Sequence, residues 1–364
     1  MMKVLWLAPN FNHYKARFLN HLAIEKDVNL TILSGTGREN MGDQELQVDW
    51  SFEHMKVDVS KRDFGKSKVV KKALKSIFSD FDWVLIPAEK KNLLLFIYAM
   101  KLRKQNPSVH LFSYNHAKLK SKNGFYGFLD HRLTKFFYNN LDLVVFYTER
   151  ACQRAIQDKL ITLEKAFWAN NTVDNTEVAK YYSFQLPPEN PQTILFIGRL
   201  IPSKRIDTLI QYYTELKKTI PNLQLEIIGD GPEQYVVKDA INVDVNIKWH
   251  GTLVDEARIA PIMKRASMIF IPGLSGLSIN HAFAYGRPYI TLEAGKHGPE
   301  FEYISQGING FVLDGDFDSN IETVKNLLLN RTILELFCDN AKSKGEYLSV
   351  QKWVQQIKSS LLHD

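Results

Sequence analysis

The chain has 364 residues, 45% of them apolar, and a formal net charge of +6. This length supplies enough apolar side chains for two hydrophobic cores, so two domains are expected. The only cysteines, Cys152 and Cys338, stand far apart, which excludes a disulfide framework and a zinc site and indicates a reducing compartment. The longest apolar run, Leu93–Met100, is far shorter than the ~18–20 residues of a membrane-spanning helix. The opening residues fit a buried strand better than a signal peptide, so a cytoplasmic location is expected.

Basic residues gather in the N-terminal half. Between Lys61 and Lys135 there are 17 Lys or Arg residues against 5 Asp or Glu. This imbalance predicts an anionic partner, although a solvated lysine-rich surface would give the same count. Residues 66–78, KSKVVKKALKSIF, place apolar side chains opposite lysines at helical spacing, which suits anionic lipid and equally suits a helix packed on its own sheet. The partner expected for residues 61–135 is an anionic membrane surface, at the inner face of the cell membrane, and not a nucleic acid.

The N-terminal half alternates predicted strands and helices. Strands are predicted at 3–8, 30–33, 84–87, 110–113 and 143–147, and helices at 10–24, 66–78, 91–104 and from Thr148 onwards. This alternation indicates a parallel, doubly wound sheet. The turn after the first strand, PNFNHYKARF, lacks the glycine fingerprint of a dinucleotide site, which disfavours a hydride-transfer enzyme.

The second half repeats the alternation after a polar, proline-containing segment, 169–193, that is expected to be a linker. Its strands are predicted at 193–197, 223–228, 247–250, 268–271, 289–292 and directly after Asn309-Gly310. A last helix is predicted over 350–362, with an apolar stripe. The fold class is therefore α/β.

A strand, loop, helix and strand over Met268–Leu313 organise this half. The helix is predicted over 278–285, with Ser278 as its N-cap and Gly286 at its end. A helix that starts at the carboxyl end of a strand favours an anionic ligand, because its first amides have no acceptor within the helix.

Two motifs carry a resemblance to a known family. The first is GRLIPSK at 198–204, directly after a predicted strand, and the second is GLSINHAFAYGRP at 276–288. Together they resemble the donor-binding core of family-4 glycosyltransferases of the GT-B fold, bacterial surface-polysaccharide type, whose members read GLS-x-x-HA-x-A-x-G-x-P.

The resemblance implies two Rossmann-like domains facing a cleft. An acceptor-binding domain would span 1–168 and a nucleotide-sugar-binding domain 194–345, and residues 346–364 would form a helix crossing back to the first domain. The implied reaction is a retaining glycosyl transfer from a nucleotide-diphosphate sugar to a glycan or lipid-linked acceptor. No metal and no cofactor are expected.

Site residues follow from the same resemblance. Arg199 and Lys204 would stabilise the leaving diphosphate, whose negative charge grows as the glycosidic bond breaks. His116, in the loop after a strand, would contact the donor sugar or the leaving phosphate, unless it is an ordinary solvated histidine. Tyr14, Lys15 and Arg17 are candidates on the acceptor side, and an ordinary polar helix start remains the alternative.

The donor-binding candidates lie mainly in the loop and helix of the second motif. They are Gly198, Leu253, Gly276, Leu277, Ser278, Asn280, His281 and Glu300. Leu253 belongs to a segment whose backbone would contact the nucleobase, and Glu300 is alternatively a simple helix-start carboxylate.

The sequence also departs from the family. Most members carry two glutamates eight positions apart, and Gly273 and His281 stand at those positions. An imidazole can still hydrogen-bond a ribose hydroxyl, whereas a glycine offers only backbone.

Two other classes of protein therefore stay open. A nucleotide-sugar epimerase of the same fold would turn over the donor without an acceptor, although no clear carboxylate pair for proton abstraction is visible. A non-catalytic partner subunit would bind nucleotide weakly or not at all.

Overall fold

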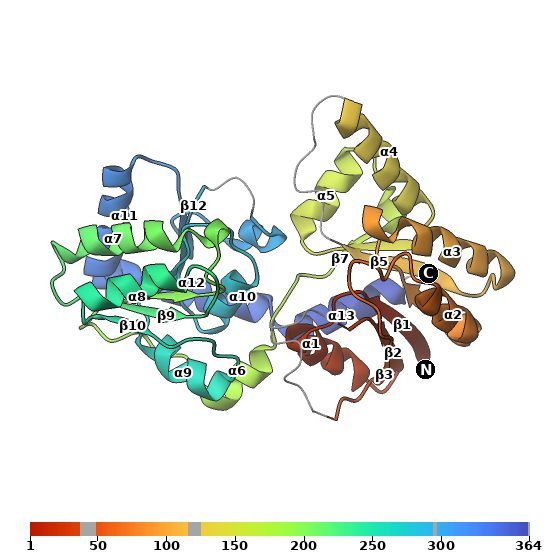
Figure 1. Cartoon of the computed structure of the whole chain (residues 1–364), viewed down its shortest axis with the longest axis horizontal. Coiled ribbons are helices and arrows are strands. Elements are labelled where there is room, and N and C mark those ends of the chain that lie inside the picture. Colours follow the sequence, from red (N-terminus) through yellow and green to blue (C-terminus); the bar gives the residue numbers. More distant parts are fainter. Residues whose placement is uncertain (37–48, 116–124, 294–296, 363–364) are drawn as a thin grey trace. The chain divides into compact units, whose positions relative to one another are not determined.

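The computed structural model describes residues 1–36, 49–115, 125–293 and 297–362. The chain forms two compact units, one made of residues 1–171 with 350–364 and the other of residues 172–349. Each unit contains one parallel β-sheet covered by helices, and Figure 1 labels many of these elements. The predicted α/β class with two doubly wound parallel sheets is confirmed.

The sheet of the first unit has the order β3-β2-β1-β4-β5-β6-β7. Its strands are β1 (Met2–Ala8), β2 (Val28–Ser34), β3 (Glu53–Lys56), β4 (Trp83–Leu85), β5 (His110–Asn115), β6 (Leu143–Phe146) and β7 (Ala166–Trp168). The two edge strands were not predicted. β3 is almost wholly exposed and polar, and the apolar β7 is only three residues long, so neither gives a clear strand pattern.

Two layers of helix cover this sheet, because successive side chains of a strand point to opposite faces. Leu5 and Leu7 of β1 face one core, and Trp6 faces the other. On the Leu5 face lie α2 (Lys68–Ile77), α3 (Leu93–Gln105), α4 (Phe125–Asn139) and α5 (Glu149–Gln157). On the Trp6 face lie α1 (His13–Ala23) and α13 (Val350–Leu361).

The C-terminal helix α13 is part of the first unit although it follows the second in sequence. Its Trp353 is buried, and the indole nitrogen donates a hydrogen bond to the Tyr114 hydroxyl at 3.1 Å. The backbone nitrogen of Asn170 donates to Gln356 Oε1 at 3.0 Å. The apolar stripe predicted over 350–362 thus packs on strands of the first sheet.

The basic helix α2 buries its apolar face within its own unit. Val70 and Leu74 lie in the core under the sheet, and Ser67 caps the helix by accepting from the backbone nitrogens of Val69 and Val70. Packing on the sheet therefore explains the amphipathic pattern of 66–78.

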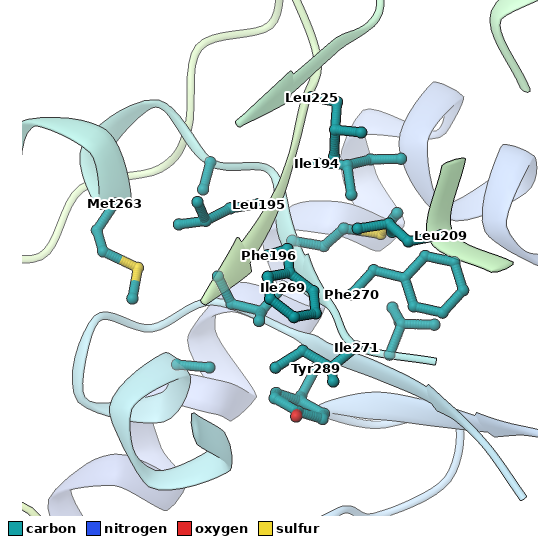
Figure 2. Packing of buried hydrophobic residues seen from close by; sticks show 14 of the residues in the cluster. Ile194, Leu195, Phe196, Leu209, Leu225, Met263, Ile269, Phe270, Ile271 and Tyr289 are labelled. Atoms are coloured by element: carbon teal, nitrogen blue, oxygen red, sulfur yellow. The ribbon is translucent and has the colours of Figure 1, made fainter. Parts of the chain in front are cut away.

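The second unit has a six-stranded sheet of order β10-β9-β8-β11-β12-β13. Its strands are β8 (Thr193–Ile197), β9 (Gln224–Ile228), β10 (Ile247–Trp249), β11 (Met268–Phe270), β12 (Tyr289–Leu292) and β13 (Gly310–Leu313). Its helices are α6 (Asn175–Tyr181), α7 (Ile206–Lys217), α8 (Gln234–Val243), α9 (Glu256–Arg265), α10 (Leu277–Ala284), α11 (Phe317–Leu329) and α12 (Arg331–Tyr347). Figure 2 shows the apolar side chains of β8 and β11 packed with Leu209, Met263 and Tyr289.

The segment 169–193, expected to be a linker, contains helix α6 and joins the second unit from Thr172 onwards. The buried guanidinium of Arg287 donates to the carbonyl oxygens of Gln185 and Met263, each at 3.0 Å. These bonds tie the segment to the start of β12 and the end of α9.

Cys152 lies in the first unit and Cys338 in the second, and both are buried free thiols. Among the described residues, no helix is long and apolar enough to cross a membrane.

Candidate functional site

The candidate site lies in the second unit, where the order of its strands reverses. β8 and β11 are neighbours, and from β8 the chain continues through β9 and β10 on one side and returns at β11 on the other. The loops that follow these two strands therefore leave the carboxyl edge of the sheet in opposite directions. In open α/β sheets this is the point where ligands bind.

The loops after β8 and β11 pack closely against each other at Gly273. The backbone nitrogen of Leu274 donates to the carbonyl oxygen of Ser203 at 2.7 Å. A Cβ atom on Gly273 would lie 2.1 Å from the same oxygen. The glutamate that the resemblance implies at this position therefore cannot stand here unless the loop of Ser203 moves.

Two cations lie together at this crevice. Arg199 is exposed just after β8, and Lys204 is half-buried at the end of the short 3₁₀ helix η4 (Pro202–Lys204). Its ammonium lies over Gly198, since a Cβ placed there would be 3.7 Å from Lys204 Nζ. Burial, together with the positive charge of Arg199, lowers the pKa of Lys204 to about 8, and the negative charge of Glu300 opposes this. A cation held beside another cation in a strand-end crevice is typical of a site for an anion.

Glu300 supplies a carboxylate whose charge acts on Lys204. It lies in the 3₁₀ helix η5 (Pro299–Tyr303), and only 3% of its surface is exposed. Its Oε2 would be 3.6 Å from a Cβ on Gly276, which places it next to the start of α10. Glu300 therefore lies at the start of a 3₁₀ turn rather than an α-helix, and its buried carboxylate belongs to the same cluster as Lys204.

The start of α10 differs from the prediction at Ser278. The helix begins at Leu277, and Gly276 takes the N-cap position without a side-chain cap. The Ser278 hydroxyl instead bonds the Tyr289 hydroxyl at 2.8 Å, and Tyr289 in turn donates to Ser275 Oγ at 3.0 Å. These bonds hold the loop in place and engage the Ser278 side chain, so the backbone amides at Leu277 and Ser278 are the groups that α10 offers to a ligand.

His281 does not stand alone. Its Nε2 lies 3.1 Å from Glu256 Oε1, and the Tyr285 hydroxyl donates to Glu256 Oε2 at 2.7 Å. Glu256 is 5% exposed and occupies the first turn of α9, where the helix dipole favours a carboxylate. Glu256 of α9 thus brings a carboxylate to His281, the position at which the resemblance implies a second glutamate.

The other candidates in this unit are placed as follows. Asn280 is buried on α10, and Leu253 follows β10 with its side chain in the hydrophobic core. A ligand near Leu253 would therefore meet backbone rather than the isobutyl group. The structure brings Gly198, Arg199, Lys204, Gly276 and Glu300 together, and α10 carries the rest of the second motif.

The acceptor-side candidates belong to the first unit. Tyr14, Lys15 and Arg17 lie on the first turns of α1, and the Lys15 ammonium donates to the Asn10 carbonyl oxygen at 2.9 Å. Asn12 caps this helix by accepting from the backbone nitrogen of Lys15 at 3.1 Å. His116 lies outside the described residues.

Sequence reasoning missed two residues of the site. Glu256 reads as an ordinary helix-start acid, and nothing in the sequence pairs it with a histidine 25 positions later. His297 accepts a bond from the Ser275 backbone nitrogen at 3.2 Å and bonds the Leu292 carbonyl at 3.1 Å. Burial lowers its pKa, and the nearby Lys204 adds to the effect. A neutral His297 thus braces the loop that holds Gly276.

A search of the described residues for groups of three or more His, Cys, Asp or Glu side chains that could hold a metal ion found none.

The chain is similar to known glycosyltransferases. Residues 191–330 match the family described as glycosyl transferases group 1. An uncharacterized glycosyltransferase of Haemophilus influenzae is 24% identical over 56% of this chain and 61% of its own length. The alpha-monoglucosyldiacylglycerol synthase of Acholeplasma laidlawii is 25% identical over 45% of this chain and 40% of its own length. The chain thus spans less than two thirds of the length of these curated relatives.

Solved structures match over the whole chain. Anabaena HepE in complex with UDP superposes with a TM-score of 0.71 at 16% identity and covers 99% of both chains. The lipopolysaccharide outer core galactosyltransferase WaaB, in its apo form, gives a TM-score of 0.65 at 16% identity, again over 99% of both chains. The chain therefore has the GT-B fold, and its residues 191–330 are similar to the group 1 glycosyl transferases.

Proposed function

We propose that this chain is a retaining family-4 glycosyltransferase that moves a sugar from a nucleotide-diphosphate donor to a glycan or lipid-linked acceptor in bacterial surface polysaccharide biosynthesis. The observation that carries the proposal is the pair of cations, Arg199 and Lys204, gathered at the β8/β11 crevice with Glu300 beside them. A diphosphate is the anion that matches two adjacent cations and the free amides of a helix start.

The chemistry needs such an arrangement. When the bond between the sugar and the diphosphate breaks, negative charge develops on the leaving phosphate oxygen. Arg199 and Lys204 would stabilise that charge directly, so the reaction is proposed to need no metal and no cofactor. Undiminished turnover in excess EDTA is the expected result, and loss of activity that Mg²⁺ restores would count against it.

The solved relatives guide the choice of substrate. Structures of HepE contain UDP, and in one case UDP with glucose, so uridine nucleotides are the first donors to test. The relatives include a glycolipid synthase and a lipopolysaccharide galactosyltransferase, which supports a hexose donor and an acceptor that is a glycan or is attached to lipid. Two buried free thiols in separate units agree with the proposed cytoplasmic location.

Donor binding can be tested by thermal shift with UDP, GDP, ADP, dTDP and CDP. A nucleotide at 100 times its dissociation constant should stabilise the fold by about 2.7 kcal/mol. Arg199→Ala should abolish the shift. Lys218→Ala is the matched control, because Lys218 lies in the same unit with its side chain 66% exposed. If no nucleotide shifts the wild type, the donor site is absent and the partner-subunit alternative replaces this proposal.

The epimerase alternative is separated by a second assay. The nucleotide sugar that binds is incubated without acceptor, and the products are resolved by chromatography. Conversion of the donor to its epimer would overturn the transferase proposal, whereas an intact donor that is consumed only when glycan acceptor is added supports it.

A further inference from the structure

Three neighbouring helices of the first unit form one continuous outer surface. The inner residues of α2, α3 and α4 pack into the same core on one face of the sheet. Lys71 Nζ lies 5.8 Å from the centre of the Tyr98 ring, which joins α2 to α3, and the rings of Phe96 and Phe137 lie 4.8 Å apart, which joins α3 to α4. Because the three helices rest on one face, their outer sides point away from the sheet together (Figure 1).

Large apolar side chains stand on this outer surface. Leu94 and Ile97 of α3 are 52% and 47% exposed, and Phe128 of α4 is 56% exposed. Leu129 and Phe136 of α4 are also exposed. Single exposed leucines are common on soluble proteins, but five large apolar side chains on two adjoining helices indicate a binding surface.

The same surface is rich in positive charge. Its exposed cations are Lys68, Lys72 and Lys75 on α2, Lys101 and Lys104 on α3, and Arg132 and Lys135 on α4. The sequences of α2 and α3 contain no acidic residue. The single acid of α4, Asp130, forms an ion pair with Lys90. The surface therefore combines apolar tips with cations that no acid of these helices neutralises.

The exposed stripe of α3 shows how the two properties are arranged. Leu94, Ile97, Lys101 and Lys104 follow one another on one face of the helix, apolar toward its start and basic toward its end. Such a stripe fits the boundary between the headgroups and the acyl chains of a bilayer, where long cationic side chains reach phosphates while apolar tips insert.

We infer that the outer surface of α2, α3 and α4 docks on an anionic lipid bilayer, with its lysines and arginines on lipid phosphates and its leucine, isoleucine and phenylalanine tips in the acyl boundary. A nucleic acid would use the cations but leave the apolar tips in water. A second copy of this chain would bring like charges together across a symmetric interface. The bilayer alone matches both properties, and this inference does not depend on glycosyl transfer.

Co-sedimentation of the full chain with lipid vesicles tests the inference. Vesicles of phosphatidylcholine with about one third phosphatidylglycerol are compared with phosphatidylcholine alone. The wild type should bind the anionic vesicles, and added salt should weaken that binding. Leu94→Asp with Ile97→Asp, and separately Lys101→Glu with Lys104→Glu, should each weaken it by about tenfold or more.

The matched control is Leu336→Asp, an exposed leucine on α12 of the second unit that is 60% exposed. It should leave vesicle binding unchanged. All four substituted positions on α3 are exposed, so thermal melts followed by circular dichroism should match the wild type and show that the variants are folded.

Four results would overturn the inference. The Leu94/Ile97 variant could bind vesicles like the wild type, or the Leu336 control could lose as much binding. Light scattering could show a wild-type dimer that the same α3 substitutions dissociate without vesicles. The chain could instead bind duplex DNA with an affinity that the lysine substitutions lower and the apolar ones do not, while vesicles stay unbound.

Discussion

The two units of this protein share one topology but differ in whether charged side chains are buried. Within the described residues, the first unit buries only uncharged polar groups and histidine, whereas the second also buries charged side chains. Those of the second unit are Glu226, Glu256, Arg287 and Glu300. A charge taken out of water is costly unless partners satisfy it, so each buried charge marks a place where the surrounding structure is fixed in detail.

The partners in the second unit show this clearly. Glu226 accepts two bonds from Arg265, at 3.0 and 2.9 Å, and lies 2.8 Å from His250 Nε2. Glu256 holds both His281 and Tyr285. The first unit instead displays its cations on the outside of α2, α3 and α4. Under the two proposals above, the second unit would fix a small anion in a defined geometry and the first would meet a broad anionic surface.

The largest expected effect comes from removing the half-buried cation of the second unit. Lys204→Ala should lower kcat/KM for glycosyl transfer. The expected loss of transition-state stabilisation is about 3–4 kcal/mol, because the developing charge of the leaving diphosphate loses its nearest cation. Steady-state kinetics measure it. Lys218 lies on the surface of the same unit. The kcat/KM of Lys218→Ala should stay within about twofold of the wild-type value, because ordinary surface substitutions change free energies by ~0.5 kcal/mol or less. A Lys204→Ala enzyme as active as that control would refute the role.

A smaller effect is expected from the buried pair of Glu256 and His281. A double-mutant cycle with Glu256→Gln and His281→Ala, followed by urea unfolding, should give a coupling energy of about 1–3 kcal/mol, because each group satisfies the other away from water. The comparison pair is Arg331 and Glu335 on the surface of α12, whose coupling should be about 0.3–0.5 kcal/mol. Equal couplings for the two pairs would mean that burial adds nothing at Glu256.

The smallest effect concerns pH. The pKa of Lys204 is lowered to about 8 by burial and by Arg199, so its ammonium is lost as the pH rises through that value. Donor affinity should then fall by up to about tenfold per pH unit above 8. Lys204→Arg should remove this fall, since a guanidinium stays protonated. Calorimetric titration of the nucleotide at several pH values measures it, and a flat wild-type profile to pH 9.5 would contradict the assignment.

Stability should respond in the opposite direction. The pKa of Lys204 is 10.5 when it is unperturbed and about 8 in the fold, so between these values the unfolded chain binds more protons than the native one. The contribution of Lys204 to the free energy of unfolding therefore rises with pH across this window and is least favourable below pH 8.

The motifs predicted the loops of the site better than they predicted its bonds. GRLIPSK correctly placed two cations between a strand and a helix, because a short loop after a buried strand leaves little freedom. Ser278 was expected to cap α10, and instead bonds Tyr289 across the loop. A serine hydroxyl can bond either the nearby helix backbone or a side chain that is distant in sequence. A local sequence pattern cannot predict the distant partner.

In the first unit, the amphipathic pattern of 66–78 likewise did not predict which contacts its apolar face makes. Apart from Val69, which is 56% exposed, its apolar residues pack toward their own sheet, so they cannot also insert into a bilayer. On the outer surface of α2, α3 and α4, most of the large apolar side chains that remain outside belong to α3 and α4, and the start of α3 is the apolar run Leu93–Met100. A run that is apolar all round cannot reveal which of its faces the sheet leaves uncovered.

The sequence by itself determined the α/β class, the alternation of strands and helices, and the loop position of the two cations of GRLIPSK, because these depend on local periodicity and turn chemistry. Only the tertiary structure decided that Gly273 has no room for a side chain, that Glu256 serves His281, and that Leu94 and Ile97 stay in solvent. Those three facts depend on which segments, distant in sequence, meet in space. Packing of that kind is settled by the whole fold and by no single stretch of it.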